Sequence, residues 1–193
     1  MVDNLLTGII GHWHIWGLSV VLVVAAVIDG WKLKVPNWLT FPLVLSGWAY
    51  GMVCFGWAGL GWSLLGTGVG LALLLPAYAI GGMGAGDVKL LAGVGAWLGA
   101  ASASAGVADT LYAFCVSAIL GGVIAVAMVV LRRQWSGHYA QFWNILTEIL
   151  VIRDPNSLAS IAAERKSSMM LLPYGIPIAV GTIAYFVWNG MFF

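Results

Sequence analysis

The sequence predicts an all-α membrane protein with six transmembrane helices. Of its 193 residues, 62% are hydrophobic and only 8% are charged, whereas a soluble domain carries about 25% charged residues. The apolar residues fall into runs long enough to cross a bilayer, since one span needs about 20 residues. No run alternates at strand length, and helices satisfy every backbone polar group within lipid. We expect one polytopic domain over residues 1–193.

Each predicted span is an apolar run bounded by polar or turn-forming residues. The spans cover about 13–29, 38–55, 62–80, 88–106, 110–131 and 171–192. The first run ends at Asp29, and Pro36-Asn37 breaks the chain before the second. Glycines recur in the third and fourth runs, where they allow close helix approach: Gly66, Gly68, Gly70, Gly93, Gly95 and Gly99.

The basic residues predict the orientation. All eight lie in the odd-numbered connections or beside them, at Lys32, Lys34, Lys89, Arg132, Arg133, Arg153, Arg165 and Lys166. The positive-inside rule therefore places these connections in the cytoplasm and both termini outside. Asp29 and Asp87 then both lie at cytoplasmic span ends. Asp109 lies at the outward start of the fifth span, where a helix N-terminus favours a carboxylate, so we expect it to act as a cap.

The connection from 132 to 170 is the one long polar loop, and it is expected in the cytoplasm. Its apolar side chains recur at helical spacing at Trp135, Tyr139, Phe142, Leu146 and Ile149. This spacing predicts an amphipathic helix on the inner membrane surface. Two roles remain open for the loop, a tether between spans and a lid beside the carboxylates.

Composition also excludes several functions. A net charge of +1 argues against a nucleic-acid partner. Cys54 and Cys115 lie far apart inside apolar runs, and no His/Cys cluster has metal-ligand spacing. We therefore expect no metal and no cofactor. The first 14 residues contain no Lys or Arg, so we expect the first run to stay as a span and not to be cleaved as a signal peptide.

Asp29 and Asp87 are the candidate catalytic residues. Carboxylates at membrane depth are costly and mark functional sites. Gly84 and Gly86 precede Asp87 without side chains, so the backbone can bend there and a substrate strand could approach. Lys89 does not share a helix face with Asp87, and we expect it to extend to the inner interface. The alternative is that each aspartate only caps or ends a span.

These residues resemble the prepilin peptidase family, the G-x-G-D aspartyl proteases of the bacterial inner membrane. That family shows an Asp, a short basic stretch and a Pro-Asn pair, as do Asp29 to Asn37 here. It later shows G-x-G-D, a hydrophobic residue, Lys and Leu, as do Gly84 to Leu90. Pro173-Tyr174-Gly175 is similar to the family's Pro-Tyr-Gly segment, so the resemblance covers nearly the whole chain. It implies that Asp29 and Asp87 are catalytic, with Gly84, Gly86, Pro36, Asn37 and Lys89 in supporting positions.

The resemblance also implies a substrate and a location, the bacterial inner membrane. The substrate is a pilin or pilin-like precursor, with a short basic leader followed by an apolar helix in the membrane lipid. Larger family members carry an additional segment with two C-x-x-C pairs, associated with N-methylation. This chain lacks those cysteines, so it is similar to the short form without methyltransferase activity.

The paired carboxylates suggest a mechanism. Two carboxyl groups that share a site cannot both ionise easily, so one keeps a proton. The ionised group can activate water while the protonated group polarises the scissile carbonyl. Two alternatives remain open. A proton-coupled small transporter also uses intramembrane carboxylates, and an inactive homologue could bind pilins as an assembly factor.

Overall fold

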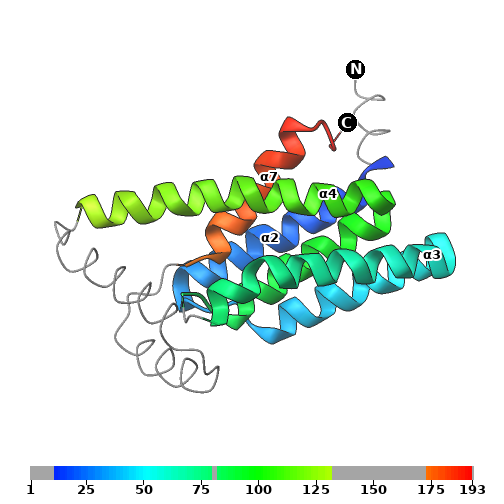
Figure 1. The fold of residues 1–193 in the computed structure, drawn as a ribbon, viewed down its shortest axis with the longest axis horizontal. Coiled ribbons are helices and arrows are strands. Elements are labelled where there is room, and N and C mark those ends of the chain that lie inside the picture. Colours follow the sequence, from blue (N-terminus) through cyan, green and yellow to red (C-terminus); the bar gives the residue numbers. More distant parts are fainter. Residues whose placement is uncertain (1–10, 80–81, 132–172, 193) are drawn as a thin grey trace.

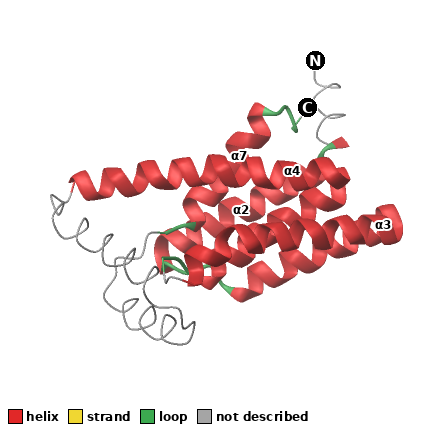
Figure 2. Ribbon diagram, viewed as in Figure 1, coloured by secondary structure: helices red, strands yellow, loops and turns green. Residues whose placement is uncertain are grey.

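The computed structural model describes residues 11–79, 82–131 and 173–192, and every regular element in these ranges is an α-helix (Figures 1 and 2). The helices are α2 (Trp13–Lys32), α3 (Asn37–Ala79), α4 (Ala85–Leu131) and α7 (Gly175–Trp188). The predicted all-α class is confirmed. The predicted amphipathic loop at 132–170 lies outside the described residues.

Two of the helices double back on themselves. α3 reverses at Gly56, which has φ 63°, and α4 reverses at Ala103, which has φ 54°. The halves of α3 are joined by a hydrogen bond from Trp48 Nε1 to Thr67 Oγ1 at 2.9 Å. Both reversals lie at the same end of the bundle (Figure 1). The described chain therefore contains six helical segments.

The predicted starts of the third and fifth segments were too late. The helix resumes directly after Gly56 and Ala103, so Trp57 to Gly61 and Ser104 to Asp109 are helical. A single residue with positive φ turns the chain at each point, and no longer loop is needed. Glycine adopts this conformation freely. Ala103 is an uncommon non-glycine case, which sequence reasoning has no means to anticipate.

Asp109 does not cap a helix as predicted. Because the segment begins after Ala103, Asp109 lies inside α4, where it is 9% exposed. Its Oδ1 accepts a hydrogen bond from the Tyr185 hydroxyl of α7 at 2.6 Å. This bond gives the buried carboxylate a strong donor and links α4 to α7.

Glycines set the packing of α3 against α4. A Cβ added at Gly66 would overlap the carbonyl oxygen of Gly95, and a Cβ added at Gly99 would overlap that of Trp62. Gly68 is the exception, because nothing lies within 4 Å of the position of its missing Cβ. The backbones of the two helices thus touch along a glycine-lined seam.

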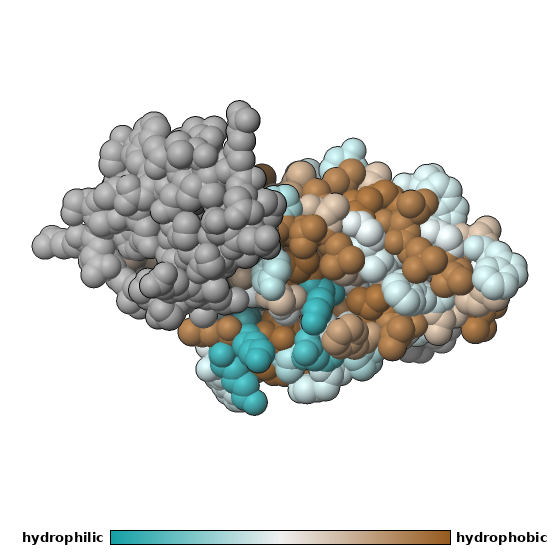
Figure 3. All heavy atoms as spheres, turned by 60° about the horizontal axis from the view of Figure 1, so that its bottom comes forward, coloured by the Kyte–Doolittle hydropathy of each residue, from teal (hydrophilic) through white to brown (hydrophobic). Residues whose placement is uncertain are grey.

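Different helix ends meet at the two ends of the bundle. The start of α2 lies beside the end of α7, where the rings of Trp16 and Phe192 are 4.7 Å apart. The opposite end gathers the end of α2 and the starts of α3, α4 and α7 (Figure 1). We call it the carboxylate end, because Asp29 and Asp87 both lie there. On the face shown in Figure 3, hydrophilic residues gather near the part of the chain drawn in grey, and apolar residues cover the helices.

The exposed surface is that of a multi-pass membrane protein. Large apolar side chains face outward along every described helix, with Val53 83% and Val126 60% exposed. Within the described ranges, α2, α3 and residues 85–128 of α4 are long and apolar enough to cross a membrane, and α7 is a shorter apolar helix. Such a surface is stable in lipid and not in water.

The seam between α3 and α4 predicts a position-specific effect of alanine. Gly66→Ala should destabilise the protein by about 1–3 kcal/mol, because its methyl group has no room beside Gly95. Gly68→Ala, two residues away on the same helix, should be neutral or slightly stabilising, since alanine favours helix and the space is open. Thermal unfolding midpoints in detergent would measure both. Equal midpoints for the two variants would contradict the backbone contact.

Candidate active site

Asp29 lies in the last turn of α2 and is 2% exposed. Its Oδ2 accepts a hydrogen bond from the backbone N–H of Gly175, the first residue of α7, at 2.7 Å. The C-terminus of α2 is an unfavourable place for an anion, but the N-terminus of α7 is a favourable one. The carboxylate of α2 is therefore held by the start of another helix.

Asp87 lies in the first turn of α4 and is 5% exposed. Its Oδ2 accepts a hydrogen bond from the N–H of Gly84 at 3.1 Å, and its own N–H donates to the carbonyl oxygen of Gly84 at 3.2 Å. This reciprocal arrangement resembles a capping box. Each aspartate thus accepts a backbone N–H through its Oδ2 at a helix N-terminus.

Three segments far apart in sequence bring the aspartates to the carboxylate end. Leu33, with φ 50°, ends α2 by donating its N–H to the carbonyl oxygen of Asp29 at 2.8 Å. The chain then places Val35, which is 2% exposed, against Gly86. Tyr174, one residue before the partner of Asp29, lies near Asp87. The loop after α2 and the starts of α4 and α7 therefore meet here.

Gly86 makes a close contact within the protein. The space of its missing side chain is taken by Val35, since an added Cβ would lie 2.5 Å from the Val35 carbonyl oxygen. At Gly84 an added Cβ would lie 3.1 Å from Asp87 Oδ2. Gly86 therefore admits the α2–α3 loop close to the backbone of α4.

The two motifs are joined by Lys89 and Asn37. Lys89 Nζ donates to Asn37 Oδ1 at 3.0 Å and lies 4.6 Å from the centroid of the Phe41 ring. Pro36 directly precedes α3, and its carbonyl oxygen accepts the N–H of Leu39 in the first turn at 3.1 Å. The predicted break before the second span is confirmed. The bond between Lys89 and Asn37 ties the start of α3 to the start of α4.

Sequence reasoning missed the roles of Tyr174 and Gly175. A Cβ at Gly175 would lie 2.9 Å from both the Cβ and the Oδ2 of Asp29, so only glycine lets α7 start this close to the carboxylate. The Pro-Tyr-Gly segment was recognised by resemblance alone. Its contact with Asp29 spans 146 residues and leaves no local signal in the sequence.

The described residues contain no group of three or more His, Cys, Asp or Glu side chains that could hold a metal ion. Cys54 and Cys115 are free thiols on exposed helix faces. His12 and His14, whose ring centroids are 6.3 Å apart, lie at the start of α2, whereas Asp29 lies in its last turn. The chemistry available at the carboxylate end is that of two buried carboxyl groups and nearby backbone amides.

Comparison with known proteins connects this site to one family. The profile of the type IV leader peptidase family matches residues 16–126, which include both aspartates. Two relatives, from Aeromonas salmonicida and Aeromonas hydrophila, are prepilin leader peptidase/N-methyltransferases. Each is 31% identical to this chain over 124 residues, which are 61% of this chain and 40% of the relative.

The matched segment thus spans less than half the length of these relatives. No solved structure matches the chain. The family profile nevertheless covers more than half of the chain, and it includes Asp29 together with the whole Gly84–Asp87 motif. The chain belongs to the type IV leader peptidase family.

Proposed function

We propose that the chain is a membrane aspartyl endopeptidase that removes the leader peptide of type IV prepilin-like precursors. The observation that carries the proposal is the burial of Asp29 and Asp87 at one end of the helix bundle, 2% and 5% exposed, in a chain of this family. Ionisable groups at membrane depth are costly and mark candidate functional sites, and these two, unlike Asp109, lie in the family's motifs.

The proposed reaction uses the two carboxyl groups in complementary protonation states. The ionised group removes a proton from water, and the water oxygen attacks the scissile carbonyl carbon. The protonated group donates a hydrogen bond to the carbonyl oxygen, and a proton then passes to the leaving amine. The C–N bond breaks, and the products are a carboxylic acid and a free amine. Either aspartate can take either role in this scheme.

The helix N-termini orient the two carboxyl groups. The amides of Gly175 and Gly84 each bond one oxygen of an aspartate at 2.7 and 3.1 Å. These bonds hold the carboxyl groups in fixed orientations before substrate arrives. Lys89 and Asn37 hold the surrounding backbone in place by their hydrogen bond at 3.0 Å.

We propose that the carboxylate end faces the cytoplasm across a bacterial inner membrane. Lys32, Lys34 and Lys89 lie at this end, and the positive-inside rule favours it as the cytoplasmic side. All six helical segments then cross the membrane, with the start of α2 and the end of α7 outside. A precursor inserted by its apolar helix presents its basic leader on this same side.

Replacing either aspartate should abolish cleavage. Asp29→Asn and Asp87→Asn should each lower the rate at least about a hundredfold, because each removes one step of the proton transfer. The assay is cleavage of a purified precursor in detergent, followed by mass spectrometry. Asp109→Asn is the matched control, since it changes a buried carboxylate bonded to Tyr185 and should keep the wild-type rate.

If either single variant cleaves the precursor at the wild-type rate, the assignment as a two-aspartate protease is contradicted. A wild-type chain that binds the precursor and leaves it intact would instead point to an inactive assembly factor.

The orientation can be tested with single cysteines in a chain whose Cys54 and Cys115 are replaced by serine. Trp57→Cys and Trp188→Cys, 78% and 90% exposed in the wild type, should react with a membrane-impermeant thiol reagent in intact spheroplasts. Leu33→Cys, 48% exposed, should react only after lysis. The reverse labelling pattern would put the carboxylates on the wrong side for a cytoplasmic leader.

A further inference from the structure

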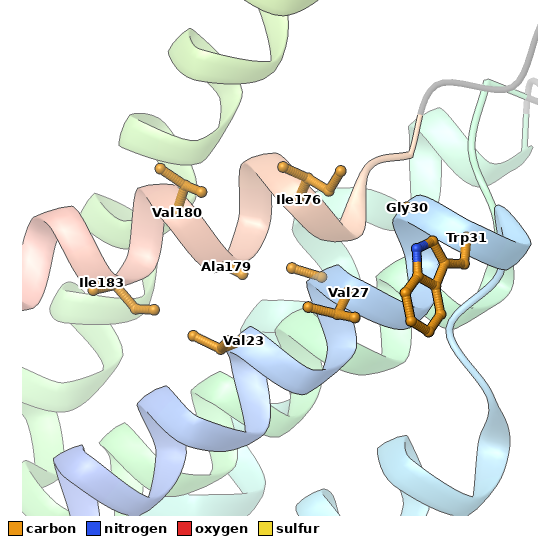
Figure 4. A pocket seen from close by; sticks show the side chains of 9 residues that line it. Val23, Val27, Gly30, Trp31, Ile176, Ala179, Val180 and Ile183 are labelled. Atoms are coloured by element: carbon orange, nitrogen blue, oxygen red, sulfur yellow. The ribbon is translucent and has the colours of Figure 1, made fainter.

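An apolar groove of about 610 Å³ lies between α2 and α7 on the surface of the bundle (Figure 4). One wall is the face of α2 from Val23 to Trp31, and the other is the face of α7 from Ile176 to Ile183. Side chains of the two helices face one another across the groove in Figure 4. Val27 and Val180 are about half exposed, at 48% and 51%, so the groove is open to the surroundings.

The groove has a shape that can accommodate a helix. Its lining residues recur every three or four positions on each helix, so they form two ridges that run along the helix axes. Each ridge is about 10 Å long, roughly two helical turns. Gly30, Ala26 and Ala179 supply small residues between the larger ones, which allows another helix to approach closely.

The chemistry of the lining restricts the occupant. Among the described residues that line the groove none is charged, and the one polar side-chain group is the indole N–H of Trp31. An occupant with polar groups would leave them without partners there. Two apolar occupants fit, namely a lipid chain and an apolar helix.

The position of the groove favours the helix. Gly30 follows Asp29 directly, and Ile176 follows Gly175, the residue that donates to Asp29. One end of the groove is therefore formed by the neighbours of the Asp29–Gly175 hydrogen bond. A helix lying in the groove therefore ends beside the Asp29 carboxylate. A lipid chain has no group that the carboxylate would act on, so the position of the groove serves no purpose for lipid.

We propose that this groove is the docking site for the apolar helix of the precursor, which lies against α2 and α7 with its leader junction at Asp29. The proposal rests on the proposed function and adds to it the path by which substrate reaches the site from the lipid. Trp31, 83% exposed at the carboxylate end of the groove, then stands where the substrate chain leaves the apolar layer.

The test is photo-crosslinking in the inactive Asp29→Asn chain, reconstituted in vesicles of phosphatidylethanolamine and phosphatidylglycerol. Benzoylphenylalanine replaces Val27 or Val180 in the groove, or Val126 on α4 as the control, which is 60% exposed and outside the groove. The probe is a precursor with a basic leader, a glycine at the cut site and an apolar helix of about 20 residues. The groove positions should crosslink to the precursor, and the control should crosslink to lipid alone.

Kinetics in the active chain provide the second readout. Val27→Trp and Val180→Trp fill the groove and should raise KM for the precursor at least tenfold, whereas Val126→Trp should keep wild-type kinetics. If both groove positions crosslink only to lipid, while the chain with Asp29 in place cleaves the precursor, the docking site is overturned. The proposed protease activity would still stand. If the wild-type chain does not cleave the precursor, the proposed function is overturned, and so is the choice of the precursor helix as the occupant of the groove.

Discussion

The hydrogen bond between the Gly175 amide and the Asp29 carboxylate is the interaction on which the site depends. It joins residues 146 positions apart at 2.7 Å and ties the end of α2 to the start of α7. A carboxylate that is 2% exposed and lacks such a donor would carry a large desolvation cost. The N-terminus of α7 offsets this cost with an amide and a favourable dipole. Asp87 obtains similar support at the start of α4, through Gly84.

The rest of the bundle serves to bring these helix ends together. Reversals at Gly56 and Ala103 return α3 and α4 to the end where Asp29 lies. The seam of Gly66 against Gly95 holds the two helices at backbone contact, and Gly86 admits the loop that follows α2. Side chains at Gly66 or Gly95 would push α3 away from α4, and one at Gly86 would push the loop after α2 away from α4. The groove between α2 and α7 continues from the same junction into the lipid-facing surface.

Much of this was predictable because it is local. Runs of apolar residues, the Pro36-Asn37 break and the G-x-G-D motif each leave a signal within a few residues. Helices form over the predicted apolar runs, although the third and fifth segments start earlier than predicted. The reversal at Ala103 was not predictable, since alanine rarely adopts positive φ. The partners of Asp29 and Asp109 were not predictable either, because Gly175 and Tyr185 meet them only through tertiary packing.

Cleavage by a Gly175→Ala variant tests the central claim most directly. The added methyl group would lie 2.9 Å from Asp29 Oδ2, so the carboxylate must move. We expect the maximal rate of precursor cleavage to fall about tenfold to a hundredfold, since small displacements of a catalytic group have effects of this size. Gly122→Ala, with open space around its added methyl group, should cleave at the wild-type rate at equal protein level. A wild-type rate for Gly175→Ala would contradict the claim that the start of α7 positions a catalytic Asp29.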